Sequence, residues 1–482
     1  MTLDSNICYR ALKARDARFD GRFFVAVSST RIYCRPVCTV KPPKRENCRF
    51  FPSAAAAEAG GYRPCLRCRP ELAPGNASVD ATTRLAQAAA SMMEDRTLDQ
   101  DGLDTLAGRL GITDRHLRRA FGAEFGVSPV EFAQTQKLLL AKRLLTDTAL
   151  PVTEVAFASG FGSVRRFNAL FKQRYRLRPR QLRAPLRGGA QIATADVLEF
   201  ELSFRPPFDW PAVSAFLGAR SIVGVEAVEG GCYRRTVRIP IDGKEHTGWV
   251  AIEMSPKKPT LRVAVSASLA KTLPPVLSRV KALMDLACHP ADVAQALGAL
   301  ARRRPGLRVP GAFDGFEMAV RAILGQQVTV AGARTVAGRF AAAFGDSFAT
   351  PFDSLTTLFP SAARVAALPP GHIARLGMPG ARARTVVALA LAVADGRLAL
   401  VPNADVEATL EVLRAMPGIG EWTAQYIAMR ALSWPDAFPH TDLGVMKALG
   451  ETRARRVLAA GEAWRPWRAY AVMHLWQSLT KE

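Results

Sequence analysis

Four cysteines near the start of the chain are spaced to bind one metal ion. Cys34 and Cys38 form one close pair, and after 26 intervening residues Cys65 and Cys68 form a second. Two chelating pairs of thiolates can close a tetrahedron around a soft cation, and four sulfur ligands favour zinc. The sequence therefore predicts one Zn²⁺ per chain. Free core thiols are the alternative, and Cys48, which lies off the paired spacing, is expected to be an ordinary buried thiol.

A lone carboxylate near the other end of the chain, Asp442, could act on a bound substrate. It follows Pro439-His-Thr and stands 22 residues past Gly420. Gly418 and Gly420 predict a tight turn between two helices, with free backbone N–H groups that can hold a DNA phosphate. Taken alone, such a turn proves little, and Asp442 could simply cap the helix that begins at Leu443.

The charge of the chain favours a polyanionic partner. Its 482 residues include 65 Lys and Arg against 42 Asp and Glu, which gives a net charge of +23, with an ordinary hydrophobic content of 49%. This balance suits a folded protein that binds nucleic acid. The sparse cysteines, the absence of a signal-peptide pattern and the lack of an apolar run of about 20 residues predict a cytoplasmic protein, nucleoid-associated when bound to DNA, with no membrane partner.

Two stretches in the part of the chain that follows the cysteine region have helix-turn-helix character. They run from Leu103 to Phe121 with Gly111 at the turn, and from Val152 to Tyr175 with Gly160 at the turn. In each, Thr113 or Ser163 is expected to cap the second helix. The second helices carry side chains suited to base edges or phosphates in a major groove, namely Arg115, Arg118 and Arg119 in one and Arg165, Arg166 and Asn168 in the other. Phosphate contact or plain solvent exposure is the alternative for each arginine.

The patterns around these residues predict four domains. Strand-like alternation occurs at 197–204, 234–241, 248–254 and 260–265, and the chain after residue 305 is helical to its end. We expect a multidomain α+β protein made of a small four-cysteine zinc domain (1–77), an all-α double helix-turn-helix domain (78–187), an α+β domain (190–305) and an all-α helix-hairpin-helix domain (306–482). Gly188 and Gly189 are expected to form a linker.

The cysteine region resembles the amino-terminal zinc domain of Ada, the methyl-sensing repair activator. The likeness covers roughly residues 1–75 and rests on Phe23-Phe-Val-Ala-Val, Ile32-Tyr-Cys-Arg-Pro-Val-Cys38, Arg45-Glu-Asn and Gly61-Tyr-Arg-Pro-Cys-Leu-Arg-Cys68. It implies that Cys34 takes a methyl group from a methylated DNA phosphate, once per molecule. Zinc keeps a thiolate deprotonated, and methylation removes one negative charge, which should raise affinity for DNA. A passive zinc clip is the alternative.

The helical segment resembles the AraC-type activator domain over about residues 80–185. The likeness rests on the tandem patterns, on Val152-Thr-Glu-Val-Ala-Phe-Ala-Ser-Gly-Phe161 and on Phe167-Asn-x3-Phe171-Lys. It implies binding to adjacent major grooves of promoter DNA and activation through RNA polymerase. We expect the chain to work as a monomer.

The carboxy-terminal half, from about residue 190 onward, resembles the AlkA type of helix-hairpin-helix DNA glycosylase. The likeness rests on Val320-Arg-Ala-Ile-Leu-Gly-Gln-Gln327, the stretch from Leu413 to Tyr426, Asp442 and the stretch from Trp464 to Trp476. It implies that Asp442 stabilises the sugar's oxocarbenium charge and orients or activates water. The same resemblance implies that Trp422, Tyr426 and Trp476 face a cationic alkylated base. Each of the three aromatic residues alone could be core.

Two positions qualify this resemblance. Gln327 stands where the AlkA type more often has an apolar wedge that fills the gap left by a flipped base. Trp422 occupies the position at which strand-cutting relatives carry a lysine nucleophile, so hydrolysis alone is expected.

The combined resemblances imply a bacterial protein of alkylation-damage repair. It would be a monofunctional DNA-3-methyladenine glycosylase of the type II class that acts on double-stranded alkylated DNA, fused to a methylphosphotriester acceptor that activates transcription. A DNA-binding regulator with structural zinc and a non-catalytic glycosylase-like module is the alternative. The base-repairing alkyltransferase motif Pro-Cys-His-Arg is absent, and Cys288 is expected to be an ordinary thiol.

Overall fold

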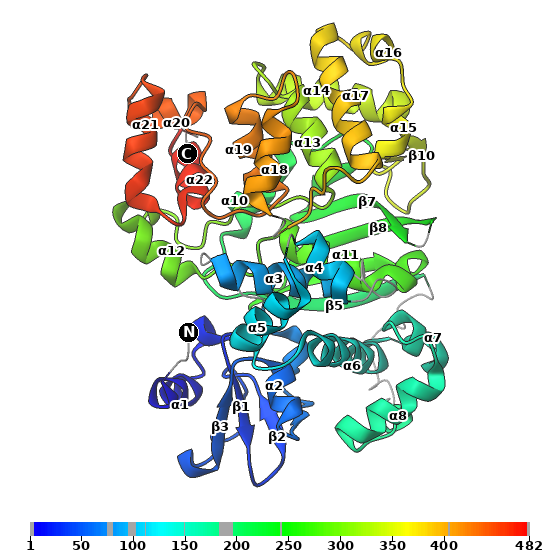
Figure 1. Ribbon diagram of the computed structural model, residues 1–482, viewed down its shortest axis with the longest axis vertical. Helices are drawn as coiled ribbons and strands as arrows, with labels where there is room; N and C mark the ends of the chain where they lie inside the picture. Colours follow the sequence, from blue (N-terminus) through cyan, green and yellow to red (C-terminus); the bar gives the residue numbers. More distant parts are fainter. Residues whose placement is uncertain are drawn as a thin grey trace.

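A computed structural model describes residues 4–74, 81–94, 103–110, 112–148, 150–182, 196–241, 243–402 and 405–479. The amino-terminal part of the chain and the helices of the carboxy-terminal part lie at opposite ends of the molecule, with a sheet between them (Figure 1). The predicted turn residue Gly111, the predicted linker Gly188–Gly189 and the expected domain limits at 77, 78, 187 and 190 lie outside the described residues. None of the described helices is long and apolar enough to cross a membrane.

The first module is a four-stranded sheet with short helices beside it. The strand order is β3-β1-β2-β4, with β2 parallel to β4 and the other pairs antiparallel. Apolar side chains from both faces of β1 are buried, which places this strand in the middle of the module. The elements are α1 (Ser5–Ala14), η1 (Ala17–Phe19), β1 (Phe24–Val27), β2 (Ile32–Cys34), η2 (Arg45–Asn47), β3 (Cys48–Phe51), α2 (Ala54–Ala59), β4 (Arg63–Pro64) and η3 (Pro70–Leu72).

The second module is helical, as the sequence predicts. Its two helix pairs, α4 with α5 and α7 with α8, lie on either side of the long helix α6. Thr113 caps α5 and Ser163 caps α8, each accepting a backbone N–H three residues ahead, which confirms the two predicted caps. The helices are α3 (Ala81–Glu94), α4 (Leu103–Arg109), α5 (Asp114–Phe125), α6 (Pro129–Asp147), α7 (Val152–Ala158), α8 (Val164–Tyr175) and α9 (Pro179–Leu182).

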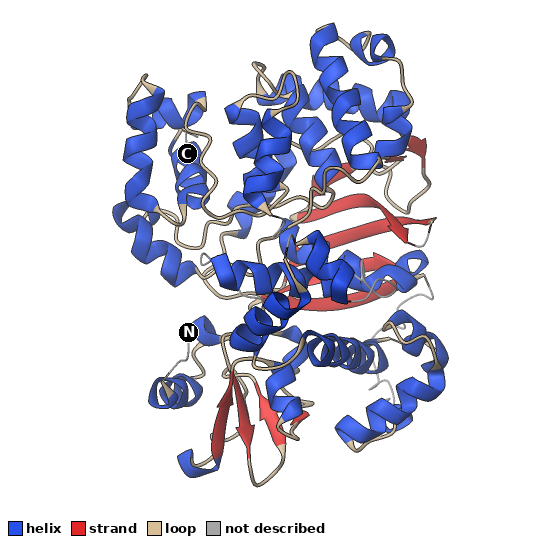
Figure 2. Cartoon of the chain, in the orientation of Figure 1, coloured by secondary structure: helices blue, strands red, loops and turns tan. Residues whose placement is uncertain are grey.

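The third region contains a five-stranded antiparallel sheet in the order β5-β9-β8-β7-β6. Figure 2 shows this sheet and the four-stranded sheet of the first module in red among the helices. The four predicted strands are present, and β6 was not predicted. The elements are β5 (Val197–Ser203), α10 (Trp210–Ala219), β6 (Glu226–Glu229), β7 (Cys232–Ile241), β8 (Lys244–Met254), β9 (Thr260–Ser266), η4 (Ala267–Thr272), α11 (Leu273–Leu283), α12 (Pro290–Leu297) and η5 (Gly298–Ala301).

The fourth region is helical apart from two strands of two residues each, which the sequence did not predict. Its core is continuous with that of the sheet and of helices α6 to α9. The elements are α13 (Gly315–Leu324), α14 (Val330–Phe344), β10 (Asp346–Ser347), β11 (Thr357–Leu358), α15 (Ala362–Ala366), α16 (Pro370–Ala374), α17 (Gly380–Ala394), α18 (Val406–Arg414), α19 (Glu421–Arg430), α20 (Leu443–Leu449), α21 (Ala454–Gly461), η6 (Glu462–Trp464) and α22 (Arg468–Ser478).

Candidate active site and metal centre

The four predicted zinc ligands lie together. Their sulfur atoms are all within 4.8 Å of one another, and Cys34, Cys38 and Cys65 are buried. The parallel pairing of β2 with β4 accounts for this, because it sets Tyr33 opposite Pro64 and so places Cys34 beside Cys65. Four sulfurs at this spacing fit a tetrahedral zinc site. Cys48 is outside the group and donates instead to the Lys44 carbonyl, at 3.3 Å.

Backbone N–H groups approach three of the four sulfurs. Arg35 N donates to Cys68 Sγ and Arg67 N to Cys65 Sγ, each at 3.4 Å, and Val40 N donates to the Cys38 sulfur. Among the described residues, no backbone hydrogen bond ends on Cys34 Sγ. Hydrogen bonds withdraw charge from a thiolate and so make it a weaker nucleophile.

At the other end of the molecule, the Asp442 carboxylate lies between two indole rings. Trp422 Nε1 donates to Oδ2 and Trp476 Nε1 donates to Oδ1, each at 2.8 Å. The carboxylate also accepts from Val445 N at 2.9 Å and so caps α20. The helix-capping role and a role at a site therefore coexist in one side chain, which is held in place by three N–H donors.

The three predicted pocket aromatic residues lie around this carboxylate. The rings of Trp422 and Tyr426 stack on α19, with centroids 5.2 Å apart and planes at 8°. The Trp476 ring, from α22, lies 6.2 Å from Tyr426, and Phe216 of α10 stacks on its indole at the same distance. Sequence reasoning missed Phe216, because only the packing of the sheet region against the last helices places it there.

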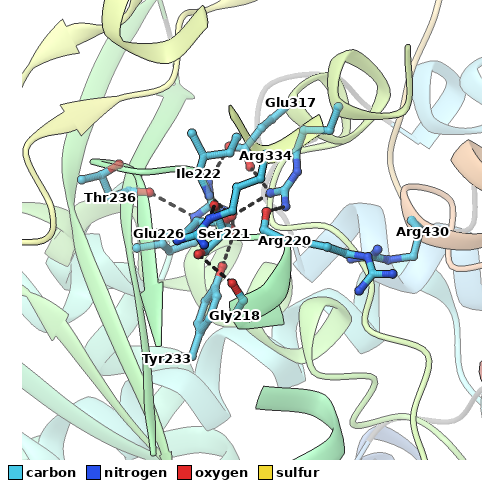
Figure 3. A network of polar contacts seen from close by, with 12 residues as sticks. Gly218, Arg220, Ser221, Ile222, Glu226, Tyr233, Thr236, Glu317, Arg334 and Arg430 are labelled. Atoms are coloured by element: carbon cyan, nitrogen blue, oxygen red, sulfur yellow. Dashed lines mark hydrogen bonds and ion pairs between the residues drawn. The ribbon is translucent and has the colours of Figure 1, made fainter. Parts of the chain in front are cut away.

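A second missed residue, Arg220, lies beside Phe216. Its guanidinium carbon is 3.8 Å from the Phe216 ring centroid, and that of Arg430 is 4.9 Å from the same ring. Figure 3 shows the two arginine side chains reaching toward each other from α10 and α19. No local sequence signal distinguishes either residue from an ordinary surface arginine.

A buried ionic network holds the end of α10 in place. Glu226 binds Arg321 at 2.7 Å, Glu317 binds Arg235 at 2.6 Å, and Arg321 donates to the Arg220 carbonyl. The Arg334 guanidinium donates to the Ser221 carbonyl at 2.9 Å. Because these contacts join the sheet to α13 and α14, they fix Phe216 and Arg220 relative to the helices of the carboxy-terminal half (Figure 3).

The predicted hairpin turn lies between α18 and α19. Gly418 has φ +90°, and a Cβ there would meet Thr385 Oγ1 at 2.2 Å, so only glycine fits. Gly420 is the N-cap residue of α19, and a Cβ there would meet nothing within 4 Å. The space beside the start of α19 is therefore open, which leaves room for a phosphate.

Gln327 lies in the middle of the loop between α13 and α14. It is exposed and has φ +55°, while Gln326 donates to the Gly418 carbonyl and to Thr423 Oγ1. These hydrogen bonds tie the Gln327 loop to the hairpin, so both predicted DNA-contacting features lie on adjoining parts of the molecule.

The predicted base-reading residues of the helical module are all exposed. Arg118 forms an ion pair with Asp114 at 2.8 Å, and Arg119 lies against His116. The others project from the second helix of each pair, namely Arg115 on α5 and Arg165, Arg166 and Asn168 on α8.

Cys288 is buried outside either site. Burial raises the pKa of its thiol to about 11, so the group is neutral and unreactive at physiological pH. This agrees with its expected role as an ordinary thiol.

Four family profiles match the chain and together cover most of it. They are the metal binding domain of Ada over residues 7–71, a helix-turn-helix domain over 106–185, the AlkA N-terminal domain over 199–314 and the HhH-GPD superfamily of base excision DNA repair proteins over 320–457. The Ada match and the four-sulfur cluster show a single structural zinc site among the described residues.

Three relatives share different extents of the chain. The probable bifunctional transcriptional activator/DNA repair enzyme AlkA of Mycobacterium tuberculosis is 40% identical and covers 99% of this chain and 97% of its own length. DNA-3-methyladenine glycosylase 2 of Escherichia coli is 36% identical over 58% of this chain and 96% of its own. The regulatory protein ada of Salmonella typhimurium is 36% identical over 32% of this chain and 42% of its own.

Proposed function

Because the chain belongs to the family of bifunctional transcriptional activators and DNA repair enzymes of the AlkA type, we propose that it removes alkylated purines at Asp442 and accepts a methyl group on Cys34. The first activity is hydrolysis of the N-glycosidic bond, as in DNA-3-methyladenine glycosylases of the type II class. The second is one methyl transfer per molecule.

The position of Asp442 between two indole N–H groups is the observation that supports the glycosylase role. Those donors, with Val445 N, hold the carboxylate in one orientation. As the glycosidic bond breaks, its electron pair leaves with the base and positive charge develops on the sugar, next to a fixed negative charge. Water then adds to the sugar carbon, and Asp442 orients that water and accepts its proton.

The aromatic residues around Asp442 support a cationic base as substrate. Trp422, Tyr426 and Trp476 present electron-rich faces, which attract a purine alkylated on a ring nitrogen. A cationic base is also the better leaving group. No lysine stands at the Trp422 position, which supports hydrolysis without strand cleavage.

Replacement of Asp442 by asparagine tests this assignment. The amide keeps the size of the side chain but lacks the negative charge. We expect release of 3-methyladenine from alkylated duplex DNA to fall by at least about 100-fold, because a preorganised charge of this kind contributes several kcal/mol. Undiminished release of 3-methyladenine would favour the alternative interpretation, in which the carboxy-terminal half binds DNA without catalysing base removal.

Cys34 is the favoured methyl acceptor of the four ligands. Zn²⁺ bound by the four sulfurs would hold them as thiolates at neutral pH. Among the described residues no backbone N–H donates to the Cys34 sulfur, whereas such donors approach the other three, which supports Cys34 as the strongest nucleophile of the set. It attacks the methyl carbon of a neutral methylphosphotriester, the C–O bond breaks, and the phosphodiester leaves with the electron pair.

Mass spectrometry of the intact chain tests the acceptor. After incubation with methylphosphotriester DNA, we expect one added methyl group on the intact chain, and fragmentation of its peptides should place that group on Cys34. Methylation of Cys38, Cys65 or Cys68 instead, or of none of them while zinc remains bound, would contradict the assignment and leave the site as a structural clip.

The helical module is proposed to direct the chain to promoter DNA. Arg115, Arg118 and Arg119 on α5 and Arg165, Arg166 and Asn168 on α8 are exposed and suited to two adjacent major grooves. We further propose that the protein acts in the cytoplasm as a monomer, with RNA polymerase as its partner at the promoter. Contacts to phosphate alone would be revealed by equal weakening of binding to every sequence when one of these side chains is removed.

A further inference from the structure

Tyr426 differs from four other buried tyrosines, Tyr33, Tyr175, Tyr233 and Tyr470, in what its hydroxyl contacts. The Tyr33 and Tyr175 hydroxyls donate to Glu58, the Tyr233 hydroxyl to Glu226 and the Tyr470 hydroxyl to Asp285. The Tyr426 hydroxyl instead accepts a hydrogen bond of 3.0 Å from Arg430. The carboxylates fix the orientation of the first four, whereas a guanidinium faces the fifth.

The hydroxyl hydrogen of Tyr426 has no acceptor among the described residues. A guanidinium group has donors only, so the hydrogen cannot point toward Arg430 or toward Arg220. Buried donors in native proteins are almost always paired, and this one lies within the aromatic cluster around Asp442. Its missing acceptor is therefore expected to come from the bound substrate.

Two positive charges next to this hydroxyl also lack an anion. Neither Arg220 nor Arg430 has a carboxylate within 4.0 Å among the described residues, and Arg430 is 3% exposed. Both guanidinium groups stack on Phe216. Arg430 donates hydrogen bonds to the Tyr426 hydroxyl and to the carbonyls of Pro310 and Gly311. Two guanidinium groups against one ring repel each other, and a negative charge nearby would offset that repulsion.

The electrostatics act on the phenol as well. Burial would raise the pKa of Tyr426, but the positive charges of Arg430, Arg220 and Arg321 outweigh it and lower that pKa below its ordinary value. A more acidic phenol donates a stronger hydrogen bond.

From this geometry, and resting on the glycosylase function proposed above, we propose that the Tyr426 hydroxyl, polarised by Arg430 and Arg220, donates a hydrogen bond to a ring nitrogen or carbonyl oxygen of the flipped base. Arg220 is a positioning residue from the sheet region, held by the ionic network around Glu226 (Figure 3).

The proposed contact matters most for an uncharged base. When the glycosidic bond breaks, the electron pair passes to the base. A cationic base becomes neutral, whereas an uncharged base such as hypoxanthine becomes an anion, with its charge shared among ring nitrogens and the carbonyl oxygen. A donor backed by two guanidinium groups stabilises the anion and does little for the neutral product.

Single-turnover excision by the full-length Tyr426→Phe variant, from duplexes that contain hypoxanthine or 7-methylguanine, tests the proposal. We expect a loss of about 10- to 100-fold with hypoxanthine, the range typical of a lost hydrogen bond to a charged group, and less than about threefold with 7-methylguanine. Tyr470→Phe, which removes an equally buried phenol oxygen outside the aromatic cluster, should slow both reactions equally or not at all.

Equal losses with both duplexes, a larger loss with 7-methylguanine or no loss would overturn the proposal. If Tyr426→Phe does not fold, Arg220→Met decides, since it should show the same preferential loss with hypoxanthine. Asp442→Asn separates the two levels of the account: if it excises 7-methylguanine normally, the proposed function itself fails, whatever the Tyr426 result.

Discussion

Asp442 combines two roles that the sequence presents as alternatives. Its carboxylate caps α20 through Val445 N and accepts an indole N–H on each oxygen. The capping hydrogen bond holds the side chain at the start of α20, and the indole hydrogen bonds set the orientation of its two oxygens. A carboxylate with three N–H donors and, among the described residues, no ion pair suits a site in which positive charge must develop on a substrate.

The indole hydrogen bond from Trp476 is expected to contribute to the rate. Trp476→Phe keeps an aromatic face but removes the N–H that holds Oδ1. We expect base release to slow by about tenfold, the usual effect of losing one charge-assisted hydrogen bond. Trp464→Phe, outside this cluster, is the matched control and should leave single-turnover excision unchanged. Equal rates for Trp476→Phe and the parent would contradict the positioning role.

The two hairpin glycines should respond differently to alanine. At Gly418 the new Cβ would overlap Thr385 and occupy an unfavourable backbone region, so we expect Gly418→Ala to destabilise the fold by about 1–3 kcal/mol. At Gly420 the Cβ meets only open space, so Gly420→Ala should fold normally and bind duplex DNA more weakly. Thermal unfolding and fluorescence anisotropy measure the two effects. Normal DNA binding by folded Gly420→Ala would show that no phosphate lies there.

Residues differ in how far the sequence alone could identify them. The cysteine pairs and the Gly418 turn are predictable, because their chemistry depends on neighbours a few positions away. Phe216 and Arg220 are not, since they lie about 200 residues before the helices that they contact and are held there by tertiary ion pairs.

At the level of elements, strand and cap patterns predicted most of the fold. The strands β5, β7, β8 and β9 show the alternation or apolar content of a half-buried sheet, and Thr113 and Ser163 mark helix starts. The edge strand β6 was missed because it is only four residues long and carries a glutamate at each end. Its Glu226 is buried by the ionic network, which local sequence cannot show.

Glu58 of α2 joins β2, the strand that ends at Cys34, to α6 and α8 of the helical module. Its buried carboxylate accepts hydroxyl hydrogens from Tyr33 on β2, Thr135 on α6 and Tyr175 on α8. These donors are neutral, and burial raises the pKa of Glu58 to about 7 from an ordinary value of 4.5. The protonated form is thus favoured in the folded protein.

This shift predicts a pH dependence of stability. The folded state binds the proton of Glu58 more tightly than the unfolded state does. The stabilisation that the protonated side chain gives the folded state is therefore complete below pH 4.5 and is lost as the pH rises through about 7. The loss is about 3 kcal/mol. Glu58→Gln, which does not titrate, should show a flatter dependence in urea unfolding between pH 5 and 8. An unchanged slope would contradict the assignment.

At the scale of the whole molecule, buried ionic contacts connect the modules. Lys142 on α6 is 1% exposed and binds Glu71, which follows the zinc region, at 2.6 Å. Arg143, the next residue, donates to the Glu201 carbonyl of β5 at 2.6 Å and stacks on Phe200. One helix therefore touches the zinc module on one side and the glycosylase half on the other.

Removing one partner of the buried pair should be costly. Glu71→Gln leaves the Lys142 charge buried without its partner, which is expected to destabilise the regulatory half by about 3–5 kcal/mol. The exposed pair Lys258–Glu201 is the control, since Lys258→Ala should change stability by no more than about 1 kcal/mol. Urea unfolding of the full chain measures both, and equal effects would show that the buried pair does not hold the modules together.

The central claim is that one chain carries two chemically independent repair sites, a thiolate and a carboxylate. The most direct test compares Asp442→Asn and Cys34→Ser in one experiment with DNA that contains both 3-methyladenine and methylphosphotriesters. We expect Asp442→Asn to gain the methyl group on Cys34 and to release base at least about 100-fold more slowly than the parent. We expect Cys34→Ser to release base at the parental rate without gaining the methyl group. Base release by Asp442→Asn at the parental rate would contradict the account.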